Sequence, residues 1–434
     1  MINNYIFIPI ELPVRELSSS AMLASFLASK GMSVVIGAQA DVKSLALSST
    51  NSIYLDKTLY SAHNDFYNKL HDRNISIFCD DIEASGCHVP ELYAQARFSK
   101  ENLDLVEGIF FWGKDDFNAV NNNYDLDIKK CHKKGSFRAY FWKYFSDNIP
   151  SNIKKKDQIT KKYKEFVFIP SNFGGSMRPD GIDAVINQAK ENYPQLTNKI
   201  IQRIEHTEKR RVDFVNAIIK LVDDHSDINF VFRPHPNEDK TKWNNIFPEK
   251  HNFFIEYEGT VTEYILGCKA LIHSGCTSAF EAYYYNKPCI AYVPDRNAKW
   301  DNWQANAMSQ EVDNYDLLSS SLKIALSTNK RIKTTNPFYA IEIDLLDYYF
   351  EIFANTLKGK IRKSKNIINT SKIFRIKRAI KAFFKIDENF SERKFDKNDL
   401  SNLCERLSFF NQSISLESVN IKQMTDKVVL LTKD

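Results

Sequence analysis

The 434-residue sequence lacks any apolar run of the roughly 20 residues that a membrane-spanning helix needs, which excludes an integral helical membrane protein. With only 13 glycines and 13 prolines, it is not a collagen-like or low-complexity chain. The seven cysteines are far apart and form no CxxC pair, so we expect reduced thiols and no structural zinc site. Residues 1–5 show neither the charged nor the long apolar region of a signal peptide, which predicts a cytoplasmic protein.

The composition is that of a globular protein large enough for two domains, with 43% hydrophobic and 26% charged residues. Its net charge of +5 is unevenly distributed, because residues 358–385 carry eleven basic side chains and no acidic one. The rest of the chain therefore carries a net charge of −6. Such a basic block favours phosphate groups of lipids or nucleic acids as partners.

The order of apolar runs and helical patterns predicts two α/β domains. A strand at 5–10, a helix ended by Gly31 and a strand at 33–37 form a βαβ opening, but no GxGxxG dinucleotide fingerprint is present. The lysine-rich stretch 154–164 is typical of a solvated linker, after which the strand and helix pattern begins again. We expect a first domain at 1–155, a second at 163–335, a returning helix within 336–357 and a basic C-terminal region at 358–434.

Further elements follow the same patterns of apolar residues. Strands are predicted at 52–55, 75–78, 108–112, 166–169, 228–232, 270–273 and 289–293. Helices are predicted at 183–192, 199–224, 261–267, 278–285 and 339–357.

The densest chemical signal begins at Arg233-Pro234-His235-Pro236, directly after the predicted strand 228–232. The two prolines stop helix and sheet alike, so His235 is expected to project from the carboxyl end of the strand, where α/β sheets bind ligands. Arg233 beside it favours an anionic ligand, since guanidinium and imidazole both suit phosphate.

A second junction runs from His273 into the predicted helix at 278–285. It contains Ser274, Gly275, Thr277 and Ser278, and Glu281 follows in the helix. A helix N-terminus with hydroxyl groups binds phosphate, although capping by Thr277 or Ser278 would explain the same residues. Glu258, at the junction before 261–267, either grips ribose hydroxyls or caps that helix, and the sequence leaves both open.

Together, Arg-Pro-His-Pro, Glu-Gly-Thr-Val, Ile-His-Ser-Gly-Cys-Thr-Ser-Ala-Phe-Glu-Ala and Lys-Pro-Cys-Ile-Ala-Tyr-Val-Pro resemble bacterial surface-carbohydrate (capsule and lipopolysaccharide) biosynthesis glycosyltransferases. They resemble transferases of 3-deoxy-manno-octulosonic acid (Kdo) and, more distantly, GT-B sialyltransferases with an HP motif. Residues 11–17 and 111–113 also resemble that family, and the likeness covers roughly 5–300.

This resemblance implies a GT-B fold, in which two Rossmann-like domains face a cleft. It implies a metal-independent, cofactor-free enzyme that moves a Kdo-like or sialic-acid-like (nonulosonic) acid from a CMP-sugar to a lipid-linked surface glycan. In the family, a His and a Ser/Thr pair hold the phosphate of the CMP-sugar and a Glu holds the ribose. By resemblance these roles fall to His235, to Thr277 and Ser278, and to Glu258, with Arg233, Ser274, Gly275 and Glu281 around the donor.

The acceptor-side catalyst is less defined by the sequence. A base or carboxylate nucleophile is expected in the cleft, and the candidates are Glu16 and Asp180, with Glu11, Arg15 and Asn172 nearby. The pairs Asp80-Asp81 and Asp115-Asp116 are interpreted as solvated caps, so no metal ligand set is predicted.

Within 358–385, Ile373, Ile376, Ile380, Phe383 and Phe384 recur at helical spacing among basic residues. This pattern predicts a helix that lies on the anionic inner face of the cytoplasmic membrane, with a domain-packing helix as the alternative. No nucleic-acid-reading motif is present, so nucleic acid is not an expected partner. Three other functions stay open: a CDP-polyol phosphotransferase of the teichoic-acid type, a non-catalytic polysaccharide assembly protein, and a UDP-sugar 2-epimerase.

Overall fold

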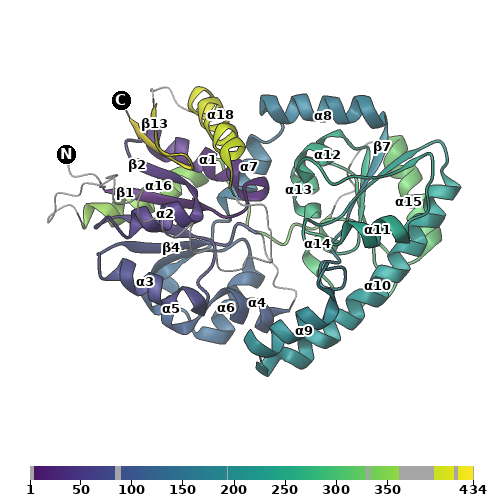
Figure 1. Ribbon diagram of the computed structural model, residues 1–434, viewed down its shortest axis with the longest axis horizontal. Helices are drawn as coiled ribbons and strands as arrows, with labels where there is room; N and C mark the ends of the chain where they lie inside the picture. Colours follow the sequence, from purple (N-terminus) through teal and green to yellow (C-terminus); the bar gives the residue numbers. More distant parts are fainter. Residues whose placement is uncertain are drawn as a thin grey trace. The chain divides into compact units, whose positions relative to one another are not determined.

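The computed structural model describes residues 4–83, 89–192, 194–328, 331, 334–360, 395–414 and 419–433, and it divides into two compact α/β units (Figure 1). The first unit comprises Met1–Ser85, Ala94–Phe141 and Tyr339–Asp434. The second comprises Gly86–Tyr93 and Trp142–Phe338. Each unit is built on a sheet of its own.

The sheet of the first unit has the strand order β13-β14-β2-β1-β3-β4-β5-β6. Its parallel strands are β1 (Tyr5–Ile10), β2 (Ser33–Ala38), β3 (Ile53–Asp56), β4 (Ser76–Asp80), β5 (Val106–Phe110) and β6 (Cys131–His132). Most of their residues are buried, as expected where helices cover both faces of a parallel sheet. The helices are α1 (Pro13–Ser29), α2 (Gln39–Ala46), α3 (Asn64–His71), α5 (Lys100–Leu105), α6 (Lys114–Tyr124), α16 (Leu345–Lys358) and α18 (Lys397–Ile414). The residues of α4 (Pro90–Arg97) and α7 (Phe137–Tyr144) are divided between the first unit and the second.

The C-terminal part of the chain completes this unit. The hairpin of β13 (Val419–Thr425) and β14 (Val428–Lys433) joins the sheet, with β14 antiparallel to β2, and α18 packs on α1 (Figure 1). The sequence patterns did not predict this, because they assigned all of 358–434 to a membrane-associating region. The basic amphipathic stretch itself lies almost wholly outside the described residues.

The second unit has a six-stranded parallel sheet in the order β12-β11-β10-β7-β8-β9. The strands are β7 (Phe166–Pro170), β8 (Asn229–Arg233), β9 (Phe253–Ile255), β10 (Ala270–His273), β11 (Cys289–Tyr292) and β12 (Gln310–Val312). The helices are α8 (Pro150–Tyr163), α9 (Gly181–Asn192), α10 (Thr197–Asp224), α11 (Lys240–Ile246), α12 (Val261–Gly267), α13 (Ser278–Tyr284), α14 (Trp303–Ala307) and α15 (Tyr315–Thr328). A core of Phe214, Ile218, Phe230, Phe232 and Trp243, with other apolar residues, supports the sheet.

The predicted strands and helices correspond to observed elements within a few residues, and two predictions need correction. The lysine-rich stretch expected to be a linker is helix α8, because lysine is a good helix former and Pro150 starts the helix at its first turn. The helix expected over 339–357 begins only at Leu345. Among the described residues, no helix has the length and apolarity needed to cross a membrane.

Candidate functional site

The carboxyl ends of β10, β7 and β8 lie side by side in the sheet of the second unit. Asn172 follows β7, His235 follows β8 and Ser274 follows β10. Parallel sheets of this kind bind ligands at that edge. Two of the sequence-predicted donor-binding residues, His235 and Ser274, are thus brought to one edge together with Asn172, which was predicted as a cleft residue.

Arg233, the last residue of β8, is used inside the protein. Its guanidinium donates hydrogen bonds to the backbone carbonyls of Glu258 (2.5 Å) and Gly259 (2.6 Å), and only 8% of the residue is exposed. These bonds connect the loop before α12 to β8. The sequence predicted that the Arg233 guanidinium binds a phosphate, but in the structure it binds backbone carbonyl oxygens.

The loop before α12 also contains the residue that caps this helix. Thr260 caps the helix in a capping box with Glu263, whose carboxylate accepts from the Thr260 N–H at 3.0 Å. Glu258 is not the cap, and it is exposed. Of the two interpretations of Glu258, only the ribose contact remains open.

Glu238, which sequence reasoning missed, organises the loop after β8. Its buried carboxylate accepts from the Phe173 N–H (2.7 Å), the His235 N–H (3.1 Å), the Ser171 hydroxyl (2.9 Å) and the Trp243 indole (2.8 Å). Burial raises its pKa, although these donors partly offset the effect. Glu238 therefore holds the ends of β7 and β8 together, while Asn237 Oδ1, 2.5 Å from Nδ1, orients the half-buried His235 ring.

The turn after β10 is built on His273. Burial, followed by the charge of Arg210, lowers the pKa of His273 to about 3, so the imidazole is neutral. Its Nδ1 accepts from the Cys276 N–H (3.1 Å), which leaves the Nε2 proton to the Ser309 hydroxyl (2.8 Å). Gly275 has φ +74°, a conformation that favours glycine. His273 is therefore a buried support for the turn and does not face a ligand.

Arg210 of α10 lies against this turn, and the sequence-based search missed it. Its Nη1 would be 3.4 Å from a β-carbon on Gly275. Only 7% of the residue is exposed, and its ion pair with Asp301 is long at 3.8 Å. Asp301 is shared with His206, whose Nε2 lies 3.0 Å away. Burial lowers the pKa of Arg210 to about 10.

Three buried polar atoms beside this turn and edge lack a hydrogen-bond partner within the described residues: Arg210 Nε, Ser274 Oγ and Asn172 Oδ1. Such atoms are costly unless water or a ligand satisfies them. Since two of them are donors and one carries the guanidinium charge, the turn is suited to an anion.

The remaining predicted donor-binding residues lie at the start of α13. Thr277 is its exposed N-cap residue and makes no side-chain capping bond, so capping does not explain its hydroxyl. The Ser278 hydroxyl donates to the Cys276 sulfur at 3.1 Å, and Glu281 accepts from the Tyr285 hydroxyl at 2.9 Å. Ser278 and Glu281 are both buried.

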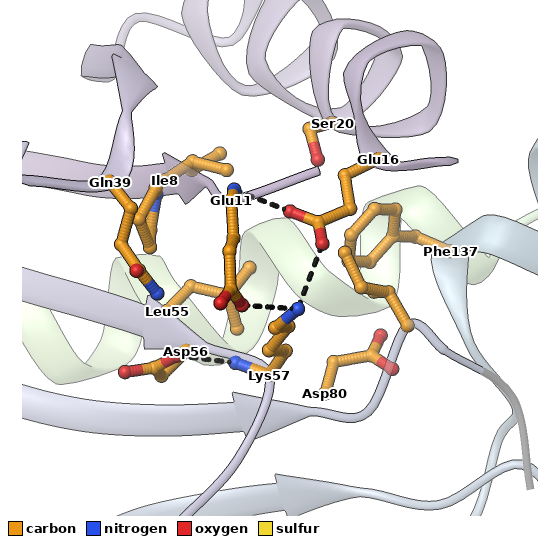
Figure 2. Close-up of a pocket in the computed structure, with 12 residues that line it drawn as sticks. Ile8, Glu11, Glu16, Ser20, Gln39, Leu55, Asp56, Lys57, Asp80 and Phe137 are labelled. Carbon is orange, nitrogen blue, oxygen red and sulfur yellow. Dashed lines mark hydrogen bonds and ion pairs between the residues drawn. The ribbon is translucent and has the colours of Figure 1, made fainter. Parts of the chain in front are cut away.

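In the first unit, a pocket opens beside the ends of β1, β3 and β4 (Figure 2). Lys57 lies at its centre: its Nζ is 2.5 Å from Glu11, 2.9 Å from Glu16 and 2.8 Å from Glu83. The predicted residues Glu11 and Glu16 are thus brought together. Arg15 is close by, with Nη1 3.2 Å from Glu83.

Lys57 is held by ion pairs with the carboxylates of Glu11, Glu16 and Glu83. Burial alone would lower the pKa of Lys57, but Glu16, Glu83 and Glu11 outweigh it and raise that pKa well above its usual range. Burial raises the pKa of Glu16, whose carboxylate also accepts from the Glu11 N–H at 2.7 Å. Glu16 is 1% exposed, and its two carboxylate oxygens already accept from Lys57 and from the Glu11 N–H, so neither oxygen is well placed to accept from the hydroxyl of an incoming acceptor.

Asp80, at the end of β4, is a carboxylate of this pocket that, unlike Glu16, has one oxygen without a hydrogen-bond partner within the described residues. It is 1% exposed, and Tyr349 (2.6 Å) and Ser136 (3.1 Å) donate to Oδ2, whereas Oδ1 has no partner within the described residues. Burial raises its pKa to about 7. The sequence interpretation of Asp80-Asp81 as solvated caps is therefore wrong, since Asp81 is also buried.

Two other carboxylates with assigned roles have local partners. Asp180 pairs with Arg178 through bonds of 2.8 and 2.7 Å and is exposed. Asp116 is a buried cap that accepts from the backbone N–H groups of Trp112 and Gly113 at the start of α6. Across the described ranges, no three His, Cys, Asp or Glu side chains are grouped to hold a metal ion.

No protein-family model matches the sequence, and no curated protein matches it. Solved structures do share the fold. The UDP-GlcNAc 2-epimerase of Methanocaldococcus jannaschii, in complex with UDP-GlcNAc and UDP, has a TM-score of 0.50 and 11% identity, over 81% of this chain and 99% of that chain. A Listeria monocytogenes protein assigned as a UDP-N-acetylglucosamine 2-epimerase has a TM-score of 0.51 and 11% identity, over 85% of this chain and all of that chain.

These likenesses, with the two parallel sheets and their helices, define the class of protein: the chain has the GT-B fold, with two Rossmann-like units. At this level of identity the likeness extends to the fold and not to an activity.

Proposed function

We propose that the chain is a GT-B glycosyltransferase that takes a nucleotide-activated sugar at the β10-β7-β8 edge of its second unit and extends a surface glycan. The observation that carries this proposal is Arg210, a buried cation whose ion pair with Asp301 is long and which lies against the Gly275 turn. A leaving phosphate would supply the missing negative charge. It would also accept from the Ser274 hydroxyl, which has no partner within the described residues.

The roles around the donor follow from position. Arg210 and the turn at Ser274 would hold the phosphate, with the hydroxyl of Thr277 exposed beside them. His235, oriented by Asn237, would meet the same phosphate from β8, and the exposed carboxylate of Glu258 would take the ribose hydroxyls. Donors fixed in place before the reaction stabilise the charge that develops as nucleotide leaves.

In the reaction, the oxygen of an acceptor hydroxyl bonds to the anomeric carbon of the donor sugar. The bond from that carbon to the phosphate oxygen breaks, and its electrons leave with the nucleotide. The hydroxyl proton passes to a base, for which we propose Asp80 in place of Glu16 and Asp180. A carboxylate with a pKa of about 7, and with one oxygen that has no partner in the described part of the chain, suits that task near neutral pH.

For the donor we propose a CMP-activated ulosonic acid, Kdo-like or sialic-acid-like. Its support is the sequence resemblance at the HP motif and at the Ser/Thr turn. The acceptor would be a lipid-linked glycan of lipopolysaccharide or capsule at the inner face of the cytoplasmic membrane, which the basic stretch 358–385 would contact.

A UDP-sugar 2-epimerase is the second candidate, because one protein with this fold binds UDP-GlcNAc and UDP. The test is a turnover screen of the full chain with CMP-, CDP-, UDP- and GDP-activated donors, with and without glycan acceptors. Release of CMP that depends on the acceptor would support the proposal. Inversion at C2 of a UDP-sugar without an acceptor would establish the epimerase, and turnover of a CDP-polyol would establish the phosphotransferase.

A histidine variant tests the donor site within that screen. His235→Ala should reduce turnover by roughly 10²- to 10³-fold, the scale for the loss of one transition-state donor. His251→Ala is the matched control, because His251 is exposed and follows α11. Wild-type turnover in His235→Ala would remove His235 from the donor site.

A further inference from the structure

Two buried polar side chains of the pocket in the first unit have an atom without a partner within the described residues. They are Ser20 on α1, through Oγ, and Asp80 at the end of β4, through Oδ1; each residue is 1% exposed. Both line the pocket, together with Glu16, Lys57 and Phe137 (Figure 2). A hydroxyl and a carboxylate left unsatisfied in one pocket point to a polar ligand group that enters it.

The size of the pocket limits what can enter. Its inner cavity measures about 20 Å³. A cavity of this size holds about one water molecule. The entering group is therefore of the size of a single hydroxyl, and the rest of its molecule stays outside.

The charge of the pocket limits the ligand further. Four carboxylates line it, those of Glu11, Glu16, Asp56 and Asp80, and Lys57 is the one cation among the lining residues. Arg15 and Arg97 are close but pair with Glu83, which adds a fifth carboxylate beside Lys57. Around Asp56, the nearby basic groups Lys43 and His63 both have lowered pKa values because of burial. The pocket is thus net acidic.

We infer that this pocket receives one hydroxyl of an uncharged acceptor sugar, and that it rejects acceptors whose terminal sugar carries a carboxylate or a phosphate. A hydroxyl suits the two unsatisfied groups, because it can donate its one proton to the Asp80 carboxylate, and its oxygen can accept from a donor such as the Ser20 hydroxyl. A second anion at this place would be repelled by the carboxylates and would leave Asp80 without a donor. This inference rests on the proposed function and names the acceptor class for it.

The experiment measures binding and needs no turnover. Methyl glycosides of glucose, galactose and mannose are compared with the corresponding methyl uronides by saturation-transfer NMR on the full chain, at pH 8 and low salt. We expect at least one neutral glycoside to bind and its uronide to bind at least about fivefold more weakly, because one added charge near an acidic cluster costs about 1 kcal/mol. Equal affinity for a glycoside and its uronide would overturn the inference, and so would the absence of binding by all of the glycosides.

Two variants place the binding in this pocket. Ser20→Ala should lower the affinity for the neutral glycoside by about 2- to 10-fold, which is the scale of one hydrogen bond. Asp80→Asn keeps the shape and removes one charge, so the preference for the neutral glycoside over its uronide should shrink at least about threefold. Asp104→Asn is the matched control, since Asp104 is 64% exposed and pairs with Lys100 outside the pocket. An unchanged preference in Asp80→Asn would contradict the assignment.

Failure of this inference can be distinguished from failure of the proposed function. If no nucleotide sugar is turned over but neutral glycosides bind with the expected preference, the transferase proposal fails and the acidic pocket stands as a sugar site. If transfer occurs and uronides serve as acceptors equally well, the function stands and the inference fails.

Discussion

Nη1 of Arg210 and the α-carbon face of Gly275 are so close that a β-carbon on Gly275 would lie 3.4 Å from that nitrogen. The contact joins the middle of the long helix α10 to the turn after β10. It places a buried positive charge at the turn where the sequence motif predicts a phosphate. The account of the donor site depends on this pair.

Gly275→Ala should therefore impair the donor site. The added methyl group would fill the space beside Arg210 and Cβ of Asn302, in van der Waals contact with both at 3.4 Å, and φ of +74° would be strained at about 1 to 3 kcal/mol. Gly181→Ala is the control: its φ is +81°, but no atom lies within 4 Å of the added carbon. By chemical denaturation both variants should lose stability, whereas nucleotide affinity should fall in Gly275→Ala alone. Equal affinities in the two would show that the turn does not contact nucleotide.

Lys57→Met should destabilise the first unit by about 3 to 5 kcal/mol, because Glu11, Glu16 and Glu83 would lose the cation they share. The control is Lys30→Met, since Lys30 pairs with the half-exposed Asp347 and such a pair contributes about 0 to 1 kcal/mol. Adding Glu16→Gln to Lys57→Met should recover part of the loss. Urea unfolding of the four proteins measures this, and equal losses in the two lysine variants would contradict the buried cluster.

Asp80 should make the stability fall as pH rises. Its pKa is about 7 in the folded protein because of burial, against an ordinary value of 3.8. From about pH 4 to about pH 7 the unfolded chain releases this proton while the folded protein keeps it, so the free energy of unfolding declines by up to about 1.4 kcal/mol per pH unit. Asp80→Asn should remove that decline and exceed the wild type in stability at pH 7.5.

The check is urea unfolding of wild type and Asp80→Asn at pH 4.5, 5.5, 6.5 and 7.5. Asp65→Asn serves as the control, because the Asp65 side chain is 82% exposed. If the difference between wild type and Asp80→Asn is the same at all four pH values, Asp80 does not hold a proton at neutral pH.

The basic stretch 358–385 should bind anionic vesicles. Each basic group near the membrane surface should contribute about 1 kcal/mol to the binding free energy, and the affinity should fall steeply as the salt concentration rises. Truncation is unsuitable as a test, since β14 pairs with β2 and α18 packs on α1 downstream of the stretch. The changes Phe383→Glu and Phe384→Glu should abolish the binding that survives high salt. Vesicle co-sedimentation at two salt concentrations measures this, and unchanged sedimentation would show that the stretch does not enter the membrane surface.

Much of the fold could be predicted from the sequence, because strands buried on both faces of a parallel sheet consist of continuous runs of apolar residues. The predicted strand 270–273 and helix 261–267 coincide with β10 and α12. The C-terminal hairpin was missed because its pairing with β2 joins residues almost 400 positions apart, which no local pattern records. The helix α8 was missed because its lysines, good helix formers, also make a polar stretch resemble a linker.

The candidate sites were predictable only in part. His235 and Ser274 stand next to strand ends and were found from motifs. Arg210 sits in the middle of a helix and comes to the turn only through packing, although Arg203, His206 and Arg210 do share a helix face at spacings of three and four. Asp80 was dismissed because an adjacent acidic pair is usually solvated, whereas burial at the end of β4 decides its chemistry.

The most direct test of the account is nucleotide binding by Arg210→Gln beside Arg211→Gln. The two arginines are neighbours on α10 and each change removes one positive charge, but Arg211 pairs with Glu208 and lies outside the turn. Isothermal titration of wild type and both variants with CMP, UDP and GDP gives the affinities. We predict that CMP binds the wild type most tightly, that Arg210→Gln weakens it at least about tenfold as expected for a charge-assisted bond, and that Arg211→Gln leaves it unchanged. Equal CMP affinity in wild type and Arg210→Gln would contradict the central claim.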